Sequence, residues 1–203
     1  MIALVDYGLG NIQAFASIYR RLGLPVTLAR TPEEMDGADK LVLPGVGAFD
    51  WAMSRLNASG LRDKLDEMVL DRKVDVLGVC VGMQMMAGRS EEGTIPGLGW
   101  IDAEVIRFDT SRFNQKTHLP HMGWNDVEPT TDVGLFHAID APRYYFLHSY
   151  HVTVKVPEHV LARASYGDSF AAAIRSENIY GTQFHPEKSH GWGVDLLRNF
   201  AEL

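Results

Sequence analysis

The sequence predicts an α/β fold: a mostly parallel central sheet flanked by helices, with an additional antiparallel β region. Over the first 90 residues, short apolar runs alternate with segments whose apolar residues recur at helical spacing. Such alternation is typical of parallel strands joined by crossover helices, with both faces of the sheet covered. From about residue 100, short β-rich stretches follow one another between Pro, Gly and Asp, which is typical of antiparallel strands and hairpins.

Four strands and three helices are predicted in the first half of the chain. The strands are aliphatic runs at 2–5, 26–29, 41–43 and 74–79. The helices have apolar residues at intervals of three or four and are predicted over 12–22, 61–73 and 83–87. The first strand passes into the first helix through the glycine turn Asp6-Tyr7-Gly8-Leu9-Gly10-Asn11.

In the second half, seven β-rich stretches precede a C-terminal helix. They are at 101–108, 124–128, 143–147, 151–156, 160–165, 171–175 and 178–184. The helix is predicted from about residue 192 to 203, where it docks back on the sheet. The chain has no sharp change in composition and no internal repeat, so we expect a single domain over 1–203.

Composition narrows the possible function classes. The 203 residues are 46% hydrophobic and 22% charged, with a formal net charge of −7 and no cluster of Lys and Arg, so we expect neither nucleic acid nor a membrane as a partner. No apolar run approaches the roughly 20 residues of a membrane-spanning helix, and the start of the chain resembles no secretion signal. A cytoplasmic protein is therefore expected.

We expect neither a cofactor nor a metal. A dinucleotide fingerprint would need a third glycine where the sequence has Gln13, and the phosphate-loop lysine motif does not occur. The pairs His118/His121 and His148/His151 have H-x-x-H spacing, which alone is a poor metal signature and is more often explained by hydrogen bonding.

The single cysteine lies in the strongest local motif, Gly78-Val79-Cys80-Val81-Gly82, between a predicted strand and a predicted helix. Small residues on both sides of a nucleophile at this junction are typical of a nucleophile elbow. The helix N-terminus would favour the thiolate. A lone cysteine is more often a buried apolar residue, but the glycines and the strand-to-helix position favour Cys80 as a nucleophile.

A general base and its orienting group are predicted in Phe184-His185-Pro186-Glu187. Side chains two residues apart on an extended segment lie on the same side, so Glu187 can hold the imidazole of His185. An incidental histidine in a surface loop is the alternative, which the presence of Cys80 on an elbow disfavours.

The third element of the predicted site is Pro44-Gly45-Val46-Gly47, at the end of the strand at 41–43. Glycines allow backbone N–H groups to approach a ligand. Together with the N–H of Val81 they would form an oxyanion hole. A simple tight turn is the alternative for this segment.

With these residues in place, the chain resembles the class I glutamine amidotransferases. Within that family it is similar to glutaminase subunits that work with a (β/α)₈-barrel cyclase. The resemblance covers nearly the whole chain. It rests on the elbow and on four further blocks: 6–11, 43–49, 120–125 (Pro-His-Met-Gly-Trp-Asn) and 148–150, together with His185-Pro186-Glu187-Lys188-Ser189.

The resemblance implies hydrolysis of glutamine to glutamate and ammonia, and a flavodoxin-like fold. The ammonia would pass to the cyclase subunit of a heterodimer, which makes imidazole glycerol phosphate and AICAR in histidine biosynthesis. It also implies roles for single residues. The implied catalytic residues are Cys80, His185 and Glu187, with an oxyanion hole at Val46, Gly47 and Val81. Glutamine would be bound by Gly45, Gln84, Ser149 and Tyr150. The partner would be contacted by Asn11, His121, Trp124 and Lys188.

Departures from the family pattern leave an alternative open. Val81 replaces the usual leucine, His151 stands where tyrosine is more common, and the segment 116–119 ahead of Pro120 is unusual. A paralogue that supplies ammonia to a sugar amidotransferase in surface-polysaccharide synthesis would share the same glutaminase chemistry. Two other classes fit less well. Cysteine-elbow hydrolases often have histidine after the nucleophile, and a non-catalytic binding module would lack a triad member.

Overall fold

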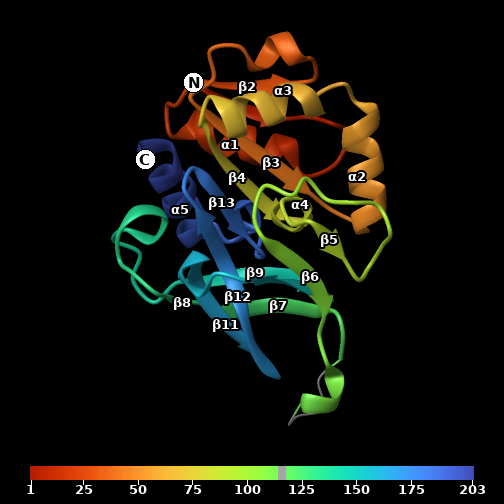
Figure 1. Cartoon of the computed structure of the whole chain (residues 1–203). Helices are drawn as coiled ribbons and strands as arrows, with labels where there is room; N and C mark the ends of the chain where they lie inside the picture. Colours follow the sequence, from red (N-terminus) through yellow and green to blue (C-terminus); the bar gives the residue numbers. More distant parts are fainter. Residues whose placement is uncertain (114–117) are drawn as a thin grey trace.

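The computed structural model describes residues 1–113 and 118–203, so residues 116 and 117 of the unusual segment before Pro120 lie outside the described residues. An eight-stranded sheet runs through the molecule (Figure 1), in the order β2-β1-β3-β4-β13-β12-β11-β8. Its first five strands are parallel and the last three are antiparallel. The strands are β1 (Ile2–Val5), β2 (Val26–Ala29), β3 (Lys40–Gly45), β4 (Asp75–Cys80), β8 (Glu128–Pro129), β11 (Val160–Tyr166), β12 (Asp168–Ser176) and β13 (Ile179–Thr182).

Helices flank the parallel part of this sheet. They are α1 (Ile12–Arg21), α2 (Phe49–Ala58), α3 (Arg62–Asp66), which continues as a π-helical turn at Glu67–Asp71, α4 (Val81–Met85) and α5 (His190–Glu202). α1 contacts α5, and α2 contacts α4. Strands β1 and β4 are buried along almost their whole length, since helices cover them, and this burial explains their uninterrupted aliphatic sequences.

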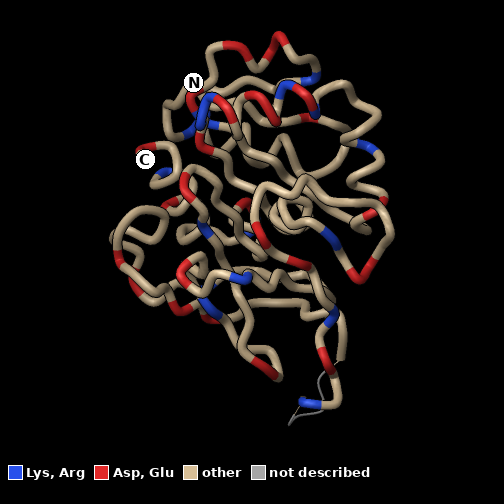
Figure 2. The backbone as a smooth tube through the Cα atoms, in the orientation of Figure 1, with Lys and Arg blue, Asp and Glu red and all other residues tan. Residues whose placement is uncertain are grey.

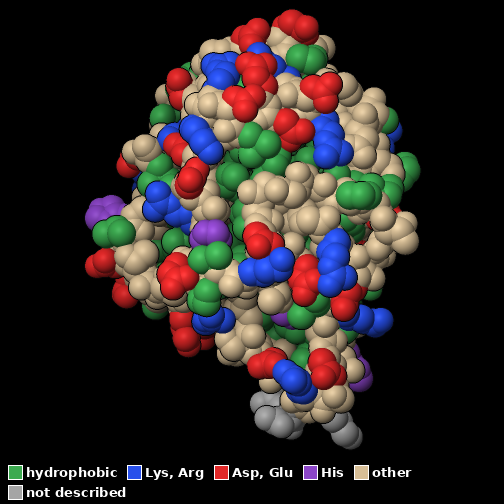
Figure 3. Space-filling view, in the orientation of Figure 1, with side chains coloured by type: hydrophobic (Ala, Val, Ile, Leu, Met, Phe, Trp, Pro, Cys, Tyr) green, Lys and Arg blue, Asp and Glu red, His purple; other side chains and the backbone are tan. Residues whose placement is uncertain are grey.

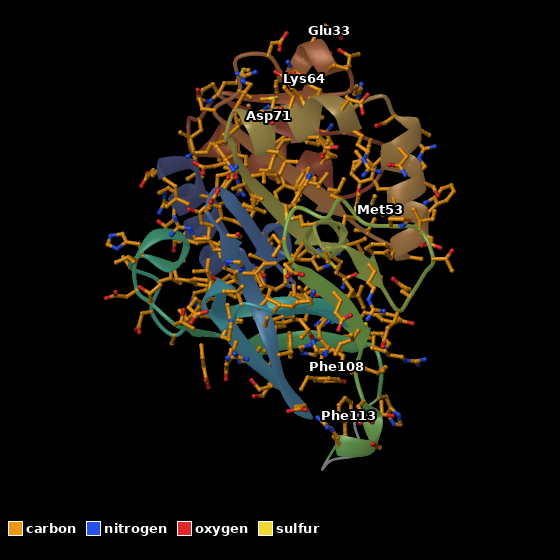
Figure 4. All side chains as sticks on the ribbon, in the orientation of Figure 1. Glu33, Met53, Lys64, Asp71, Phe108 and Phe113 are labelled. Carbon is orange, nitrogen blue, oxygen red and sulfur yellow. The ribbon has the colours of Figure 1, made fainter. Side chains whose placement is uncertain are left out.

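Two small sheets complete the fold beside the antiparallel strands (Figure 1). One contains β10 (Tyr150–Val154), β6 (Ala103–Arg107) and β5 (Arg89–Ser90), and the other contains β7 (His121–Asp126) and β9 (Arg143–His148). Aromatic rings pack between these sheets and β12. Phe108 and Phe113 lie together at the end of the molecule remote from Glu33 and Lys64 (Figure 4), with ring centroids 6.2 Å apart.

The predicted fold class is confirmed, and several elements differ in detail. Helix α2 was not predicted, although Phe49, Ala52, Met53 and Leu56 form its buried face. The stretch 124–128 is divided between two sheets, because β7 pairs with β9 whereas β8 pairs with β11. The stretch 178–184 is expected among the antiparallel strands; β13 ends at Thr182 and pairs antiparallel with β12, but it also pairs in parallel with β4. It therefore joins the parallel and antiparallel halves of the sheet.

The surface carries interspersed charges. Acidic and basic residues are scattered over the whole backbone (Figure 2), and the face in Figure 3 shows both signs between apolar and neutral atoms. Within the described ranges, no helix is both long enough and apolar enough to cross a membrane.

Candidate active site

Cys80 lies at the junction of β4 and α4 in a strained backbone conformation. Its φ is +56° and its ψ is −112°, a region that non-glycine residues avoid. A side chain on Gly78 or Gly82 would overlap neighbouring backbone, so only glycine fits at either position. The predicted nucleophile elbow is therefore present in the structure, with Cys80 at its apex.

Strand β3 brings the glycine-rich segment beside this elbow. β3 and β4 run in parallel with Gly45 opposite Cys80. A Cβ on Gly45 would overlap the backbone nitrogen of Gly82. Gly45 is buried in close contact with the elbow, and the glutamine contact expected of it stays a prediction.

His185 and Glu187 form a buried pair after β13. The imidazole Nδ1 of His185 is 3.0 Å from Oε1 of Glu187, and both side chains are at most 3% exposed. The backbone fixes the histidine at both ends: its N–H donates to the carbonyl of Tyr145, and its carbonyl accepts a hydrogen bond from Ser189 Oγ. The predicted pairing of these two side chains is thus seen in the structure.

The pKa of His185 reflects opposing effects. Burial lowers it, but hydrogen bonds to Cys80 and Glu187, together with their negative charges, outweigh burial and raise it to about 10. Since Nδ1 faces Glu187, Nε2 is the nitrogen left for the sulfur. The site thus combines a cysteine sulfur with an imidazole that a carboxylate holds at its other nitrogen.

The sulfur of Cys80 has two further polar neighbours. Nε2 of Gln183 donates to it at 3.8 Å, and the carbonyl oxygen of Leu147 lies at 3.9 Å. Oε1 of Gln183 accepts a hydrogen bond from Nε2 of Gln84 at 3.1 Å.

A cavity of about 310 Å³ opens at Cys80. Its wall contains most of the predicted site: Val46, Gly47, Cys80, Val81, Gln84, Ser149, Tyr150, His185 and Lys188. Leu147, His148, Glu92 and Pro120 also line it. A larger hollow of about 770 Å³ lies over residues 129–142 and contains none of the predicted site residues. The nucleophile therefore has an accessible cavity of its own.

The expected oxyanion donors reach this cavity from two elements. Val81 is the first residue of α4, where backbone N–H groups lack partners inside the helix. Val46 and Gly47 follow β3, and Gly47 has a φ of +85°, which favours glycine. All three line the cavity, which is the location that an oxyanion hole requires.

Three of the four residues expected to contact a partner lie where a partner can reach them. Asn11 is exposed at the start of α1, and Trp124 stacks on His190 with ring centroids 5.3 Å apart. Lys188 is exposed and lies 5.9 Å from the ring of Tyr145. His121 corrects the expectation: it is 3% exposed, because its side chain points into the aromatic core, so it offers a partner no surface.

The sequence reasoning missed several site residues. Gln183, Glu92 and Leu147 have no role in the sequence analysis, and His148 appears there only in a family motif and in an H-x-x-H pair, without a role in the site. Gln183 could have been found, because a polar residue directly after the wholly buried strand β13 requires a polar partner inside the protein. Glu92 gives no such signal: its carboxylate accepts a hydrogen bond from the N–H of Phe49, a contact between distant segments.

A metal centre is not formed among the described residues, where no group of three His, Cys, Asp or Glu side chains could hold an ion. Of the H-x-x-H histidines, His121 and His148 are hydrogen-bonded to each other and His151 packs on Phe108, whereas His118 is exposed. Chemically, the site presents a nucleophile, a paired imidazole and backbone donors, which together suit acyl transfer from an amide or ester.

Comparison with known proteins agrees with this chemistry. The family of class I glutamine amidotransferases matches residues 3–203. The chain therefore belongs to the class I glutamine amidotransferase family, and the resemblance inferred from its motifs is confirmed.

Two relatives narrow the resemblance. The imidazole glycerol phosphate synthase subunit HisH of Bdellovibrio bacteriovorus is 53% identical over 204 residues, which covers 100% of both chains. The protein of the same name from Leptospira interrogans is 47% identical, again with 100% of both chains covered. Among solved structures, a glutamine amidotransferase has a TM-score of 0.75 at 21% identity, covering 99% of this chain and 97% of that one. That likeness shows the fold.

Proposed function

We propose that the chain is the glutaminase subunit of an imidazole glycerol phosphate synthase, folded as a single domain over 1–203 and active in the cytoplasm. One observation carries the glutaminase assignment: Cys80 sits on a strained elbow beside His185, and Glu187 holds the other nitrogen of that imidazole. The full-length HisH relatives support the choice of synthase.

In the proposed reaction, the thiolate of Cys80 attacks the carboxamide carbon of glutamine. A tetrahedral intermediate forms, and its oxyanion is received by backbone N–H groups at Val81 and at the Val46–Gly47 peptide. His185 gives its Nε2 proton to the departing ammonia, and a thioester of Cys80 remains. His185 then removes a proton from water, which attacks the thioester and releases glutamate. Glu187 keeps the imidazole oriented throughout.

The cavity suits the rest of the glutamine molecule. Gln84, Ser149 and Tyr150 line it together with Cys80, and Glu92 adds a carboxylate. A carboxylate attracts the α-ammonium group of an amino acid, whereas the amide of Gln84 offers neutral hydrogen-bonding atoms. The volume of about 310 Å³ is at the small end of ligand cavities, as a single amino acid requires.

The proposed partner is a (β/α)₈-barrel cyclase subunit that docks over the mouth of this cavity to form a heterodimer. Exposed apolar side chains lie there: Val46 and Leu147 line the cavity, and Met122 is the cross-strand neighbour of Leu147. Asn11, Trp124 and Lys188 would add contacts. A docked barrel would keep the ammonia neutral and away from bulk water on its way to the cyclase, which makes imidazole glycerol phosphate and AICAR.

The test is glutamate release by the chain together with a barrel cyclase partner. Cys80→Ala and His185→Ala are expected to abolish release, and His137→Ala, a change at an exposed histidine, to leave it intact. Undiminished release by Cys80→Ala would overturn the proposal. Release that occurs only with a sugar-modifying acceptor protein would instead support the paralogous function.

A further inference from the structure

A chain of hydrogen bonds crosses the protein behind the cavity, and its direction is fixed at the outer end by Asn125. The side-chain oxygen of Asn125 accepts from the N–H of Asp126 at 2.9 Å, and Nδ2 donates to the carbonyl of Ser165 at 2.8 Å. These two contacts set the orientation of the amide. Nδ2 is also 3.3 Å from Nε2 of His121, so that nitrogen must be the unprotonated acceptor.

Two buried histidines continue the chain. With Nε2 of His121 as acceptor, Nδ1 carries the proton and donates to Nε2 of His148 at 3.0 Å. His148 then has its own proton on Nδ1, which donates to the carbonyl oxygen of Tyr150 at 2.8 Å. A carbonyl oxygen can only accept a hydrogen bond. The Asn125 amide at one end and the Tyr150 carbonyl at the other therefore require the same donor-to-acceptor direction along the chain. Each imidazole is therefore neutral, in a single tautomer.

The carbonyl of Tyr150 links this pair to the cavity. It also accepts from Nε2 of Gln84 at 3.1 Å, and the second hydrogen of that nitrogen goes to Gln183. Gln183 in turn donates to the sulfur of Cys80. The amide nitrogen of Gln84 is thus fully used within the protein. Among the described residues its Oε1 has no hydrogen-bond partner, so this oxygen is the atom left for a ligand.

Packing holds the two rings in place. His121 lies between Phe146 and Tyr166, with ring centroids 4.7 and 4.0 Å away. His148 packs against Phe108 at 5.4 Å. Burial lowers the pKa of both histidines, that of His121 to about 4, so both are neutral at pH 7.

We propose that His121 and His148 are positioning residues that set the orientation of the Gln84 amide and thereby the glutamine subsite. The inference rests on the proposed glutaminase function. Without the proton from His121, the Nε2 atom of His148 loses its donor and the ring is free to change tautomer. The Tyr150 carbonyl then loses its fixed donor, and the Gln84 amide can turn its nitrogen toward the ligand. Glutamine binding suffers more than the chemistry at Cys80.

Protonation of His121 should raise the KM for glutamine, as removal of its imidazole should. A proton on Nε2 of His121 would point at the N–H of Asn125, which places two donors face to face. Beside burial, positive charge on His121, His151 or His185 disfavours protonation of His148. Asp168 and Glu91 act on His151 in the opposite sense. Tyr166 stacks on His121 through its ring. The KM for glutamine is therefore expected to rise as the pH falls toward 4.

Two reciprocal substitutions test the proposal in the complex with a barrel partner. His121→Phe keeps a flat ring between Phe146 and Tyr166 but has no N–H. His121→Asn keeps an N–H near the position of Nδ1 but loses the stacking. We expect His121→Phe to raise the KM for glutamine about tenfold with kcat changed less than threefold, and His121→Asn to keep KM within about threefold of the wild type. The matched control is Tyr166→Phe, which leaves the ring on His121 in place.

Thermal unfolding of the two variants separates a positioning role of His121 from a packing role. If His121 acts only through packing, His121→Asn should be the less stable variant and should also have the higher KM. A KM for His121→Phe equal to that of the wild type, or a KM for His121→Asn above that of His121→Phe, overturns the proposal. If neither variant folds, ¹⁵N NMR spectra of His121 and His148 in the wild-type protein give the tautomers directly. Protonation at Nδ1 of both rings at pH 7 supports the proposal. Protonation at Nε2 of either ring overturns it. An inactive wild-type complex would instead refute the glutaminase function.

Discussion

Gly82 lies directly against the carbonyl oxygen of Leu43, with no room for a side chain between them. This contact connects the helix of the elbow to the neighbouring parallel strand. Because β3 also brings Val46 and Gly47 to the cavity, the same approach sets the spacing between the nucleophile and the expected oxyanion donors. A glycine is thus required at a position that does not itself line the cavity.

The first prediction concerns this contact. Gly82→Ala forces the elbow away from β3 and should lower the free energy of unfolding by about 1–3 kcal/mol, the cost of overpacking a core. Urea denaturation measures it. Gly191→Ala in α5 is the matched control, since a Cβ there meets nothing within 4 Å. We expect the control to be neutral or slightly stabilising, and an equal loss in both variants would contradict the argument.

Glu187→Gln tests whether Glu187 fixes the tautomer and orientation of the His185 imidazole. The substituted amide keeps the shape of the side chain but can place an N–H against Nδ1 of His185, which favours the wrong tautomer. We expect kcat for glutamate release to fall about 10²–10⁴-fold. Glu158→Gln, at an exposed site, is the control and should retain full activity. A kcat within tenfold of the wild type would remove Glu187 from the proposed triad.

Cys80→Ala should change the titration of His185. Cys80 raises the pKa of this imidazole through a hydrogen bond and its charge, so the variant should titrate below the value of about 10 of the native site. Histidine NMR measures the pKa directly. The native pair also affects stability: its contribution is fully present below pH 6.5 and is lost as pH rises toward 10. An unchanged pKa in the variant would show that the thiolate does not face the imidazole.

His121 should contribute to unfolding by acid. Its pKa is lowered from 6.5 to about 4 by burial, so the stability from the neutral ring is present above pH 6.5 and is lost as pH falls toward 4. The full loss is about 3 kcal/mol. Unfolding measured over this range should therefore be less pH-dependent in His121→Phe. His148 contributes in the same direction, so some dependence should persist. Equal slopes in both proteins would be evidence against a neutral His121.

Met122→Lys should weaken docking of the partner. Met122 is 64% exposed beside the cavity mouth, and a lysine there would have to give up its hydration on binding. Isothermal titration with the barrel protein should show a Kd at least tenfold higher. Val133→Lys is the matched control: Val133 is 62% exposed, but on the segment between β8 and β9. A weaker complex for the control alone would place the interface elsewhere.

The elbow at Cys80 and the pairing of His185 with Glu187 were evident in the sequence because both depend on neighbours within a few residues. Glycines beside a nucleophile and side chains two positions apart on an extended segment have local geometry that no other part of the chain needs to supply. The alternation of strands and helices follows from the same kind of short-range pattern, so the fold class was also predictable.

Only the tertiary structure decided which distant groups meet. His121 and His148 are cross-strand neighbours in β7 and β9, and that register buries the histidine that the motif suggested for a partner surface. Gln183 reaches the sulfur of Cys80 because β13 lies beside β4, a pairing between strands about 100 residues apart. Hydrogen bonds of this kind depend on strand order and register. Burial of the whole sheet sets both, so neither can be predicted from a short stretch of sequence.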